Sequence, residues 1–123
     1  MYDDELASLI NKLKQGDIYA FESLYKSYHQ RIYNFCLKLL PTSYDAQDAV
    51  QKVFITVWEQ KEILDSSKSF TAYIYSVARY TAYHDYKKLL YRKAAMEQMF
   101  SERSIFNVAD KDELLYQELT LFW

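Results

Sequence analysis

Residues 42–58 read TSYDAQDAVQKVFITVW. The apolar side chains in this stretch recur every three or four residues, which is the spacing of one face of an α-helix and not the alternation of a β-strand. Thr42 or Ser43 can cap this helix, because a hydroxyl oxygen there accepts a hydrogen bond from an otherwise unpaired backbone N–H. The stretch therefore predicts a helix whose inward face carries Ala46, Ala49, Val50, Val53, Phe54 and Val57.

The same helical spacing continues on both sides of this stretch. Gly16 is a plausible stop for a first helix, Asp17 can cap a second, and Pro41 ends that second helix. The polar segment 61–69 predicts a loop, after which a fourth helix starts near Ser69 and runs past Lys93. The predicted inward residues of the first helix are Leu6, Leu9, Ile10 and Leu13. Those of the second helix are Ile18, Phe21, Leu24, Tyr25, Tyr28, Ile32, Phe35, Cys36 and Leu39. Those of the fourth helix are Phe70, Tyr73, Ile74, Val77 and Thr81.

These elements together predict an all-α protein. We expect a compact bundle of about four helices, with a short C-terminal tail or an extra helix over about 112–121. The length of 123 residues suits one domain. Only one glycine and one proline occur, which argues against a β-sandwich and against a glycine-rich phosphate loop.

Three features predict a soluble, cytoplasmic protein. The chain starts with MYDDEL, which is acidic, whereas a signal peptide starts with basic residues. No apolar run approaches the roughly 18 residues that are needed to span a bilayer. Cys36 is the one cysteine, so neither an internal disulfide nor a thiolate metal cluster is expected.

The sequence holds no convergent set of catalytic or metal-binding side chains. His29 and His84 are far apart, and neither belongs to a zinc-binding motif. Cys36 lies on the apolar stripe of the second helix, so we interpret it as core filler and not as a nucleophile. We therefore expect no enzymatic activity, no metal and no cofactor.

Positive charge is concentrated in one segment of the chain. The net charge of the whole chain is −2, yet residues 68–93 carry six basic side chains against Asp85 alone, a net charge of +5. In helical register Tyr80, Tyr83 and Lys87 share one side of this segment, with Arg79 beside them. Unpaired bases stack on tyrosine rings while basic side chains hold phosphates, which predicts a nucleic-acid-binding helix. The alternative is that the tyrosines are half-buried packing residues.

The third helix has a second face, which points away from its apolar one. An apolar isoleucine stands there among charged and amide side chains, a composition that fits a protein-binding patch and equally an ordinary solvated face. The residues of this face are Asp48, Gln51, Lys52, Ile55 and Glu59.

Three blocks of the sequence, in their order and spacing, resemble region 2 of the extracytoplasmic-function (ECF) sigma factors of the sigma-70 family. They are DIYAFESLYKSY at 17–28, AQDAVQKVF at 46–54 followed by Trp58, and SFTAYIYSVAR at 69–79. The resemblance extends over about residues 5–95 and implies the helical fold of region 2 and a non-enzymatic role in transcription initiation.

Region 2 of this family docks on the clamp helices of the β′ subunit of core RNA polymerase. It also recognises and helps melt the −10 promoter element and captures the non-template strand. The resemblance thus implies a polymerase-binding face formed by Asp48, Gln51, Lys52 and Ile55. It further implies that the loop 65–69 cradles an everted base and that DNA is bound by Ser66, Ser67, Lys68, Arg79, Tyr80, Tyr83, His84, Lys87 and Lys88.

Two departures from the family pattern leave the promoter preference open. Tyr80 stands where asparagine is common, and His84 stands where aspartate or asparagine is usual. We expect a region-2-like domain over 1–101 and a linker or tail over 102–123, at the start of an absent C-terminal domain; the sequence is then a fragment or a natural truncation. The apolar end 121–123 suggests self-association, and an anti-sigma factor is another expected partner. The alternative function is a degenerate sigma-like helical interaction module without promoter activity.

Overall fold

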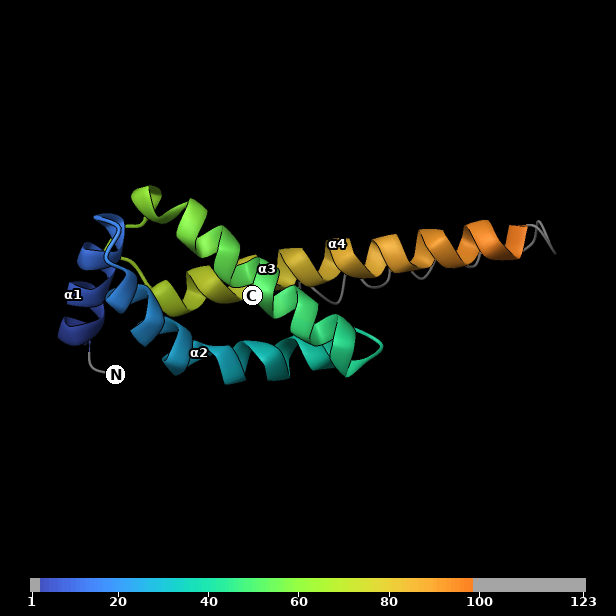
Figure 1. The fold of residues 1–123 in the computed structure, drawn as a ribbon, viewed down its shortest axis with the longest axis horizontal. Helices are drawn as coiled ribbons and strands as arrows, with labels where there is room; N and C mark the ends of the chain where they lie inside the picture. Colours follow the sequence, from blue (N-terminus) through green and yellow to red (C-terminus); the bar gives the residue numbers. More distant parts are fainter. Residues whose placement is uncertain (1–2, 99–123) are drawn as a thin grey trace.

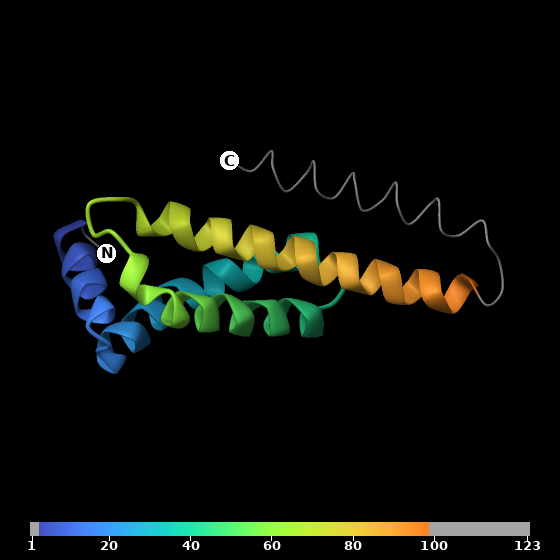
Figure 2. The same cartoon turned by 90° about the horizontal axis from the view of Figure 1, so that it is seen from above.

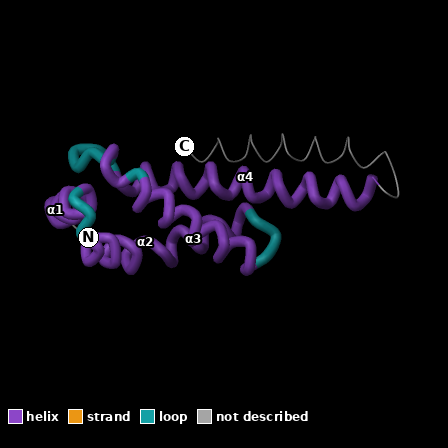
Figure 3. Tube along the Cα trace, turned by 45° about the horizontal axis from the view of Figure 1, so that its top comes forward, coloured by secondary structure: helices purple, strands orange, loops and turns teal. Residues whose placement is uncertain are grey.

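The computed structural model describes residues 3–98, and these residues form helices joined by short loops (Figure 3). The elements are α1 (Asp3–Lys14), α2 (Ile18–Leu39), α3 (Ser43–Glu59), the short 3-10 helix η1 (Lys61–Ile63) and α4 (Phe70–Gln98). No strand occurs within this described part, so the predicted all-α bundle is confirmed. The predicted helical stretch 112–121, the tail 102–123 and the apolar end 121–123 lie outside the described residues.

Local side-chain chemistry sets the helix boundaries. Asp17 Oδ1 accepts hydrogen bonds from the backbone N–H groups of Tyr19 at 2.9 Å and Ala20 at 3.4 Å, which caps α2 as predicted. Thr42 caps α3, because its Oγ1 accepts from the N–H of Asp45 at 3.1 Å. Gly16 turns the chain between α1 and α2 with a φ of +86°, a conformation that a residue with a Cβ rarely adopts.

Helix α3 packs against both α2 and α4, while α2 packs against α1, α3 and α4. In Figure 1 α2 and α3 form a V that closes at the loop 40–42, and α3 crosses α4. All six residues that were predicted on the inward face of α3 are buried. The core also takes Ile10 and Leu13 from α1 and a stripe of α2 residues: Ala20, Leu24, Tyr28, Ile32, Cys36 and Leu39.

Nine of the eighteen residues predicted to face inward on α1, α2 and α4 are not fully buried, and five of these nine are half-buried against the core: Leu6, Leu9, Phe21, Phe35 and Tyr73. Ile18 and Tyr25 were predicted to face inward, but both are exposed, Ile18 by 54 %. On α4 the predicted Val77 and Thr81 are only half-buried. Helix α4 contacts both α2 and α3, and its buried stripe follows every fourth residue: Phe70, Ile74, Ala78 and Ala82. The alanines are fully buried because a small side chain lets neighbouring helices approach closely.

The C-terminal part of α4 extends well beyond α3 and the end of α2 (Figures 1 and 2). Its side chains there are mostly exposed, including Tyr91, Arg92 and Lys93. The basic segment 68–93 therefore lies partly on the body of the bundle and partly on this extension. Among residues 3–98, none of the helices combines the length and the apolar character that crossing a membrane requires.

Candidate functional site

Helix α4 carries a strip of aromatic rings next to cations. Tyr80 is 67 % exposed, and its ring lies 4.3 Å from that of His84, centroid to centroid. The His84 ring also lies 5.4 Å from the ring of Tyr83. Lys87 Nζ is 5.7 Å from the Tyr83 ring centroid and 5.8 Å from that of Tyr91, so its charge lies near two tyrosine rings. The α4 strip, defined as Tyr80, Tyr83, His84 and Lys87, thus combines flat apolar surfaces with positive charge.

The tyrosines of the α4 strip do not all play the same part. Tyr83 is half-buried and packs against the hydrophobic core, which agrees with the alternative prediction of a packing role. Tyr80 points outward, and Lys88, about two turns further along α4, is also exposed. Arg79 is half-buried and lines a groove towards α2. The surface available to a ligand is therefore centred on Tyr80.

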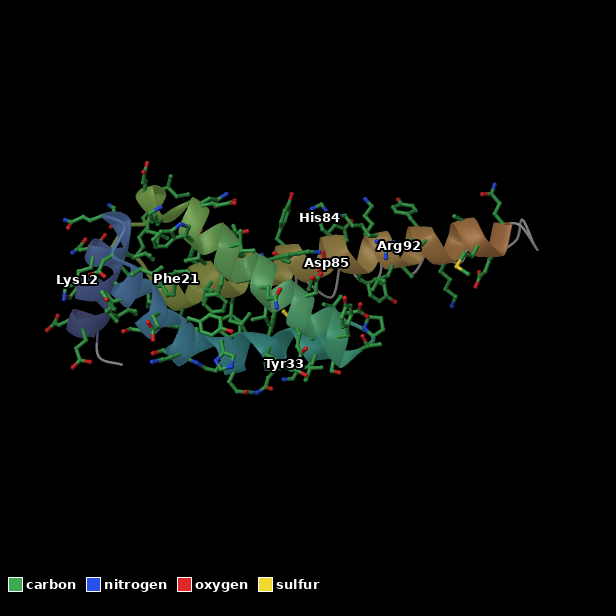
Figure 4. The ribbon with its side chains drawn as sticks, in the orientation of Figure 1. Lys12, Phe21, Tyr33, His84, Asp85 and Arg92 are labelled. Carbon is green, nitrogen blue, oxygen red and sulfur yellow. The ribbon has the colours of Figure 1, made fainter. Side chains whose placement is uncertain are left out.

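Asp85 is the one acidic residue between positions 68 and 93, and it is turned away from solvent towards α3. Its side chain is 12 % exposed, and Lys52 Nζ donates a 2.9 Å hydrogen bond to its Oδ1. In Figure 4 Asp85 lies on α4 near the point where α3 crosses it. Because its charge is matched within the fold, Asp85 does little to offset the positive charge on the outer side of α4.

The loop 65–69 holds its conformation through its own side chains. Asp65 Oδ1 accepts hydrogen bonds from the backbone N–H of Ser67 at 2.9 Å and from its hydroxyl at 2.6 Å. Ser69 Oγ accepts from the N–H of Ala72 at 3.1 Å and so caps α4. Between this loop and α1 lies a pocket of about 320 Å³, lined by Leu6, Ala7, Ile10, Ser66, Ser67, Lys68, Ser69, Phe70 and Thr71. The structure thus brings the predicted loop residues Ser66, Ser67 and Lys68 to the rim of one small hollow.

The turn that Asp65 and Ser67 form is expected to open in acid. The Ser67 hydroxyl first, and then the Ser67 backbone N–H, hold the pKa of the Asp65 carboxyl below its ordinary value. A lowered pKa means that the turn is intact above the ordinary aspartate pKa of about 3.9 and opens as the pH falls through the lowered pKa. We expect the carboxyl carbon of Asp65 and the amide of Ser67 to titrate together in NMR spectra below that value. Ser67→Ala should move the midpoint upward, and a midpoint unchanged by Ser67→Ala would contradict this assignment.

The outer face of α3 is exposed as predicted at three of its four candidate polymerase-binding positions. Asp48 and Gln51 are exposed, and Ile55 is 55 % exposed. Lys52 is different, because its Nζ lies 3.0 Å from Asp48 Oδ2 as well as 2.9 Å from Asp85 Oδ1. The pKa of Lys52 is raised, and the hydrogen bond to Asp85 is the main cause. Lys52 thus joins the α3 face to α4 and keeps its positive charge.

A polar groove adjoins this face between α2 and α3. It has a volume of about 530 Å³, and its lining includes Gln51, Gln47 and His29. His29 stacks on Tyr25 with ring centroids 5.0 Å apart, and its buried Nδ1 has no hydrogen-bond partner among the described residues. Sequence spacing gives no sign of this groove, since its lining residues come from two helices, four from α2 and three from α3.

A second groove runs between α2 and α4. It has a volume of about 520 Å³ and takes Phe35 and Lys38 from α2 and Arg79 from α4. Helical spacing predicts Phe35 on the inward face of α2 and no role for Lys38, and Phe35 is half-buried against the core. Only the packing of α2 beside α4 brings these side chains next to a predicted DNA-binding residue.

The described residues contain no group of histidine, cysteine and carboxylate side chains arranged to hold a metal ion. Cys36 is fully buried, and burial raises the pKa of its thiol to about 12. A thiol with so high a pKa carries almost no thiolate at neutral pH, so Cys36 is unsuited to act as a nucleophile.

Comparison with known proteins identifies the bundle. A family model described as sigma-70 region 2 matches residues 24–92, which run from α2 to α4 and include the whole of α3 and the loop 65–69. The ECF RNA polymerase sigma factor SigW of Bacillus subtilis (strain 168) is 29 % identical over 69 residues, which are 56 % of this chain and 37 % of that protein. The chain therefore aligns with little more than a third of the length of this curated relative. No solved structure matches it significantly. Because the family model covers more than half of the chain, the resemblance read from the three sequence blocks is confirmed: this chain belongs to the sigma-70 region 2 family.

Proposed function

We propose that this chain binds core RNA polymerase through the outer face of α3 and recognises and helps melt the −10 promoter element through α4 and the loop 65–69. Membership of the sigma-70 region 2 family supports a sigma-factor role in transcription initiation. The observation that carries the finer proposal is the presence of two separate exposed surfaces on one helical bundle. One is the α3 face with Asp48, Gln51 and Ile55, and the other is the α4 strip around Tyr80.

The α3 face suits a protein partner. An exposed isoleucine flanked by carboxylate and amide groups offers an apolar centre with a polar surround, as protein interfaces commonly have. The polar groove that contains Gln51 and His29 extends this surface towards α2. We propose the clamp helices of the β′ subunit as its partner. An anti-sigma factor that competes for the same face is a second proposed partner.

The α4 strip suits an opened DNA strand. Taking a base out of the stack costs a few kcal/mol, and stacking of that base on an aromatic side chain stabilises the complex by about 1–3 kcal/mol. Tyr80 offers such a ring, and Lys87 and Lys88, about two turns further along the same helix, are proposed to hold phosphates. The pocket beside the loop 65–69 is proposed to receive an everted base through the serines at its rim. Such a role operates beside RNA polymerase, in the cytoplasm, and needs no catalytic group.

Polymerase binding is tested with paired alanine substitutions on the α3 face. Asp48→Ala combined with Gln51→Ala removes one carboxylate and one amide that are exposed in the free protein, and we expect at least about tenfold weaker binding to a β′ clamp-helix fragment. The control is Glu22→Ala combined with Gln15→Ala, which removes the same two kinds of group at exposed positions elsewhere. If the α3 variant bound the clamp-helix fragment as tightly as the parent chain in a pull-down and in calorimetry, the α3 face would be excluded as the polymerase-binding surface.

The alternative function, a sigma-like interaction module without promoter activity, rests on the two departures from the family pattern at Tyr80 and His84. Their ring centroids lie 4.3 Å apart in an edge-to-face arrangement, so two positions at which the family usually has short polar side chains here carry aromatic rings in contact with each other. Transcription in vitro with core polymerase separates the two functions, because promoter-specific initiation requires both surfaces.

A further inference from the structure

The extension of α4 carries an apolar stripe beyond the last residue that this helix buries in the core (Figures 1 and 2). The core cluster takes its last buried member of α4 at Ala82, and the same spacing of four residues continues to Tyr86, Leu90 and Ala94. Leu90 is only 7 % exposed although it is not a member of the core cluster, and Ala94 is half-buried. The extension stripe, defined as Tyr86, Leu90 and Ala94, is therefore an apolar surface that the core of the bundle does not account for.

Positive charge borders the extension stripe. Residues 86–94 read YKKLLYRKA and contain four basic side chains and no acidic one. In helical register Lys87 and Lys93 lie on the two edges of the stripe. Lys93 Nζ lies 3.8 Å from Glu97 Oε1, a long contact between partly exposed groups that offsets little of this charge. A segment that covers the stripe should therefore be apolar along one face and acidic at its edges.

The sequence of residues 112–123 has this composition. It reads DELLYQELTLFW, with three acidic side chains and no basic one. In the helical register predicted for this stretch, Leu115, Leu119 and Phe122 share one face. Asp112 and Glu118 lie on the two edges of that face in the same register. The segment thus complements the extension stripe in both apolar surface and charge.

The chain between the two is long enough to bring them together. Residues 99–111 number 13, and 13 extended residues span at most about 43 Å. A helix of ten residues is about 15 Å long, which equals the rise of α4 over ten positions from Tyr86. Because this tether holds the segment at an effective concentration on the order of millimolar, a weak contact is enough for docking.

We propose that segment 112–123 packs against the α4 extension of its own chain, with Leu119 over Leu90 and its carboxylates beside the basic side chains at the edges of the stripe. The docked segment then lies at the end of the α4 strip, where it competes with the phosphates of a DNA strand for the same positive charge. The free chain binds DNA more weakly than it would without these carboxylates. The competition rests on the proposed function, whereas the docking does not.

The first test detects the docking without DNA. A nitroxide spin label is attached to the full chain through Thr120→Cys, on the side of the predicted segment helix away from Leu119. Cys36 does not take up the label, because it is fully buried and the pKa of its thiol is raised to about 12. We expect the amide NMR signals of residues 86–94 to broaden and those of α1 to stay sharp. Leu119→Asp should remove the broadening, and Leu37→Asp, the same change at a position 40 % exposed on α2, should leave it.

A second copy of the chain is the competing source of the segment. Mixing isotope-labelled chain that carries no nitroxide with spin-labelled chain that carries no isotope separates the two cases, since only contacts between copies then broaden a signal. Signals of 86–94 that stay sharp in this mixture support docking within one chain. Broadening of these signals in the mixture would assign the segment to a neighbouring copy and overturn the inference, as would sharp signals in both samples.

The second test measures the competition with DNA. The probe is a fluorescently labelled 12-nucleotide single strand of −10-like sequence, titrated with the full chain. Asp112→Asn combined with Glu118→Gln removes two carboxylates with little change in shape, and it should tighten binding severalfold at low salt and less at high salt. The control is Asp4→Asn combined with Glu22→Gln, the same change in charge at exposed positions of α1 and α2.

An equal gain in affinity in both variants would show that only net charge matters and would overturn the competition. If neither the parent chain nor the variants bound the strand, the proposed function and the competition would both be wrong. The spin-label experiment would still decide whether the segment docks, so the two failures are distinguishable.

Discussion

Replacing Tyr80 and Lys87 together by alanine is expected to weaken binding of a −10-like single strand by one to two orders of magnitude. Loss of one stacked base accounts for about 1–3 kcal/mol, or roughly 5- to 150-fold in affinity. Removing the Lys87 ammonium, which lies 5.7 Å from the Tyr83 ring, takes away a positive charge at the same strip. Because Tyr80 is 67 % exposed, little packing is lost with its ring.

Fluorescence anisotropy at low and at physiological salt measures this loss. A matched control is Tyr19→Ala combined with Lys26→Ala, which removes an exposed tyrosine and an exposed lysine from α2. We expect the α4 variant alone to show a large loss, and its circular dichroism and melting temperature to stay close to those of the parent chain. A loss that is equal in both variants would mean that only bulk charge drives binding, and it would remove the α4 strip from the proposed site.

The second large effect concerns stability. Ile74 is fully buried at the point where α4 packs against α2 and α3. Ile74→Ala removes three carbon atoms from a close-packed site, so we expect the free energy of unfolding to fall by about 2–5 kcal/mol. Because the net stability of a domain is typically only about 5–15 kcal/mol, this loss is a large fraction of it, and the melting temperature should fall markedly. Above the lowered melting temperature, polymerase binding and DNA binding should be lost together.

Urea denaturation followed by circular dichroism measures this change. The control is Ile55→Ala, the same chemical change at a position that is 55 % exposed on α3, where we expect a loss of no more than about 0.5 kcal/mol. The midpoint of unfolding should fall while the slope with denaturant stays the same. If Ile55→Ala were as destabilising as Ile74→Ala, the described packing of α3 and α4 would be wrong.

The two proposed binding surfaces are linked inside the fold by Lys52. Its ammonium group bridges Asp48 on the α3 face and Asp85 on α4. An i,i+4 pair such as Asp48 and Lys52 is visible in a helical sequence. The contact with Asp85 spans 33 positions, and sequence spacing offers no hint of it. Lys52 was predicted to bind polymerase, and the structure gives it a second task in holding α3 against α4.

Much of the fold is encoded locally and was therefore predictable. Asp17 and Thr42 cap their helices through side-chain oxygens that lie two or three residues from the N–H groups they accept from. The apolar face of α3 was predicted at all six positions, because a helix buried between two others shows one clear stripe. The concentration of positive charge on α4 and the outward Tyr80 also follow from spacing along one helix.

What the sequence by itself determined was the helical type of the main elements, most of the helix ends and the inward face of α3, together with the three family blocks. Only the tertiary structure decided which helices meet. The contacts between helices explain why Ala78 and Ala82 are buried more deeply than Val77 and why Asp85 turns towards Lys52. They also explain why Lys38 borders a groove beside Arg79. The physical reason is the distance along the chain over which each interaction acts. Caps and helical periodicity act within one or two turns, whereas interhelical grooves and ion pairs depend on crossing angles set by the packing of the whole core.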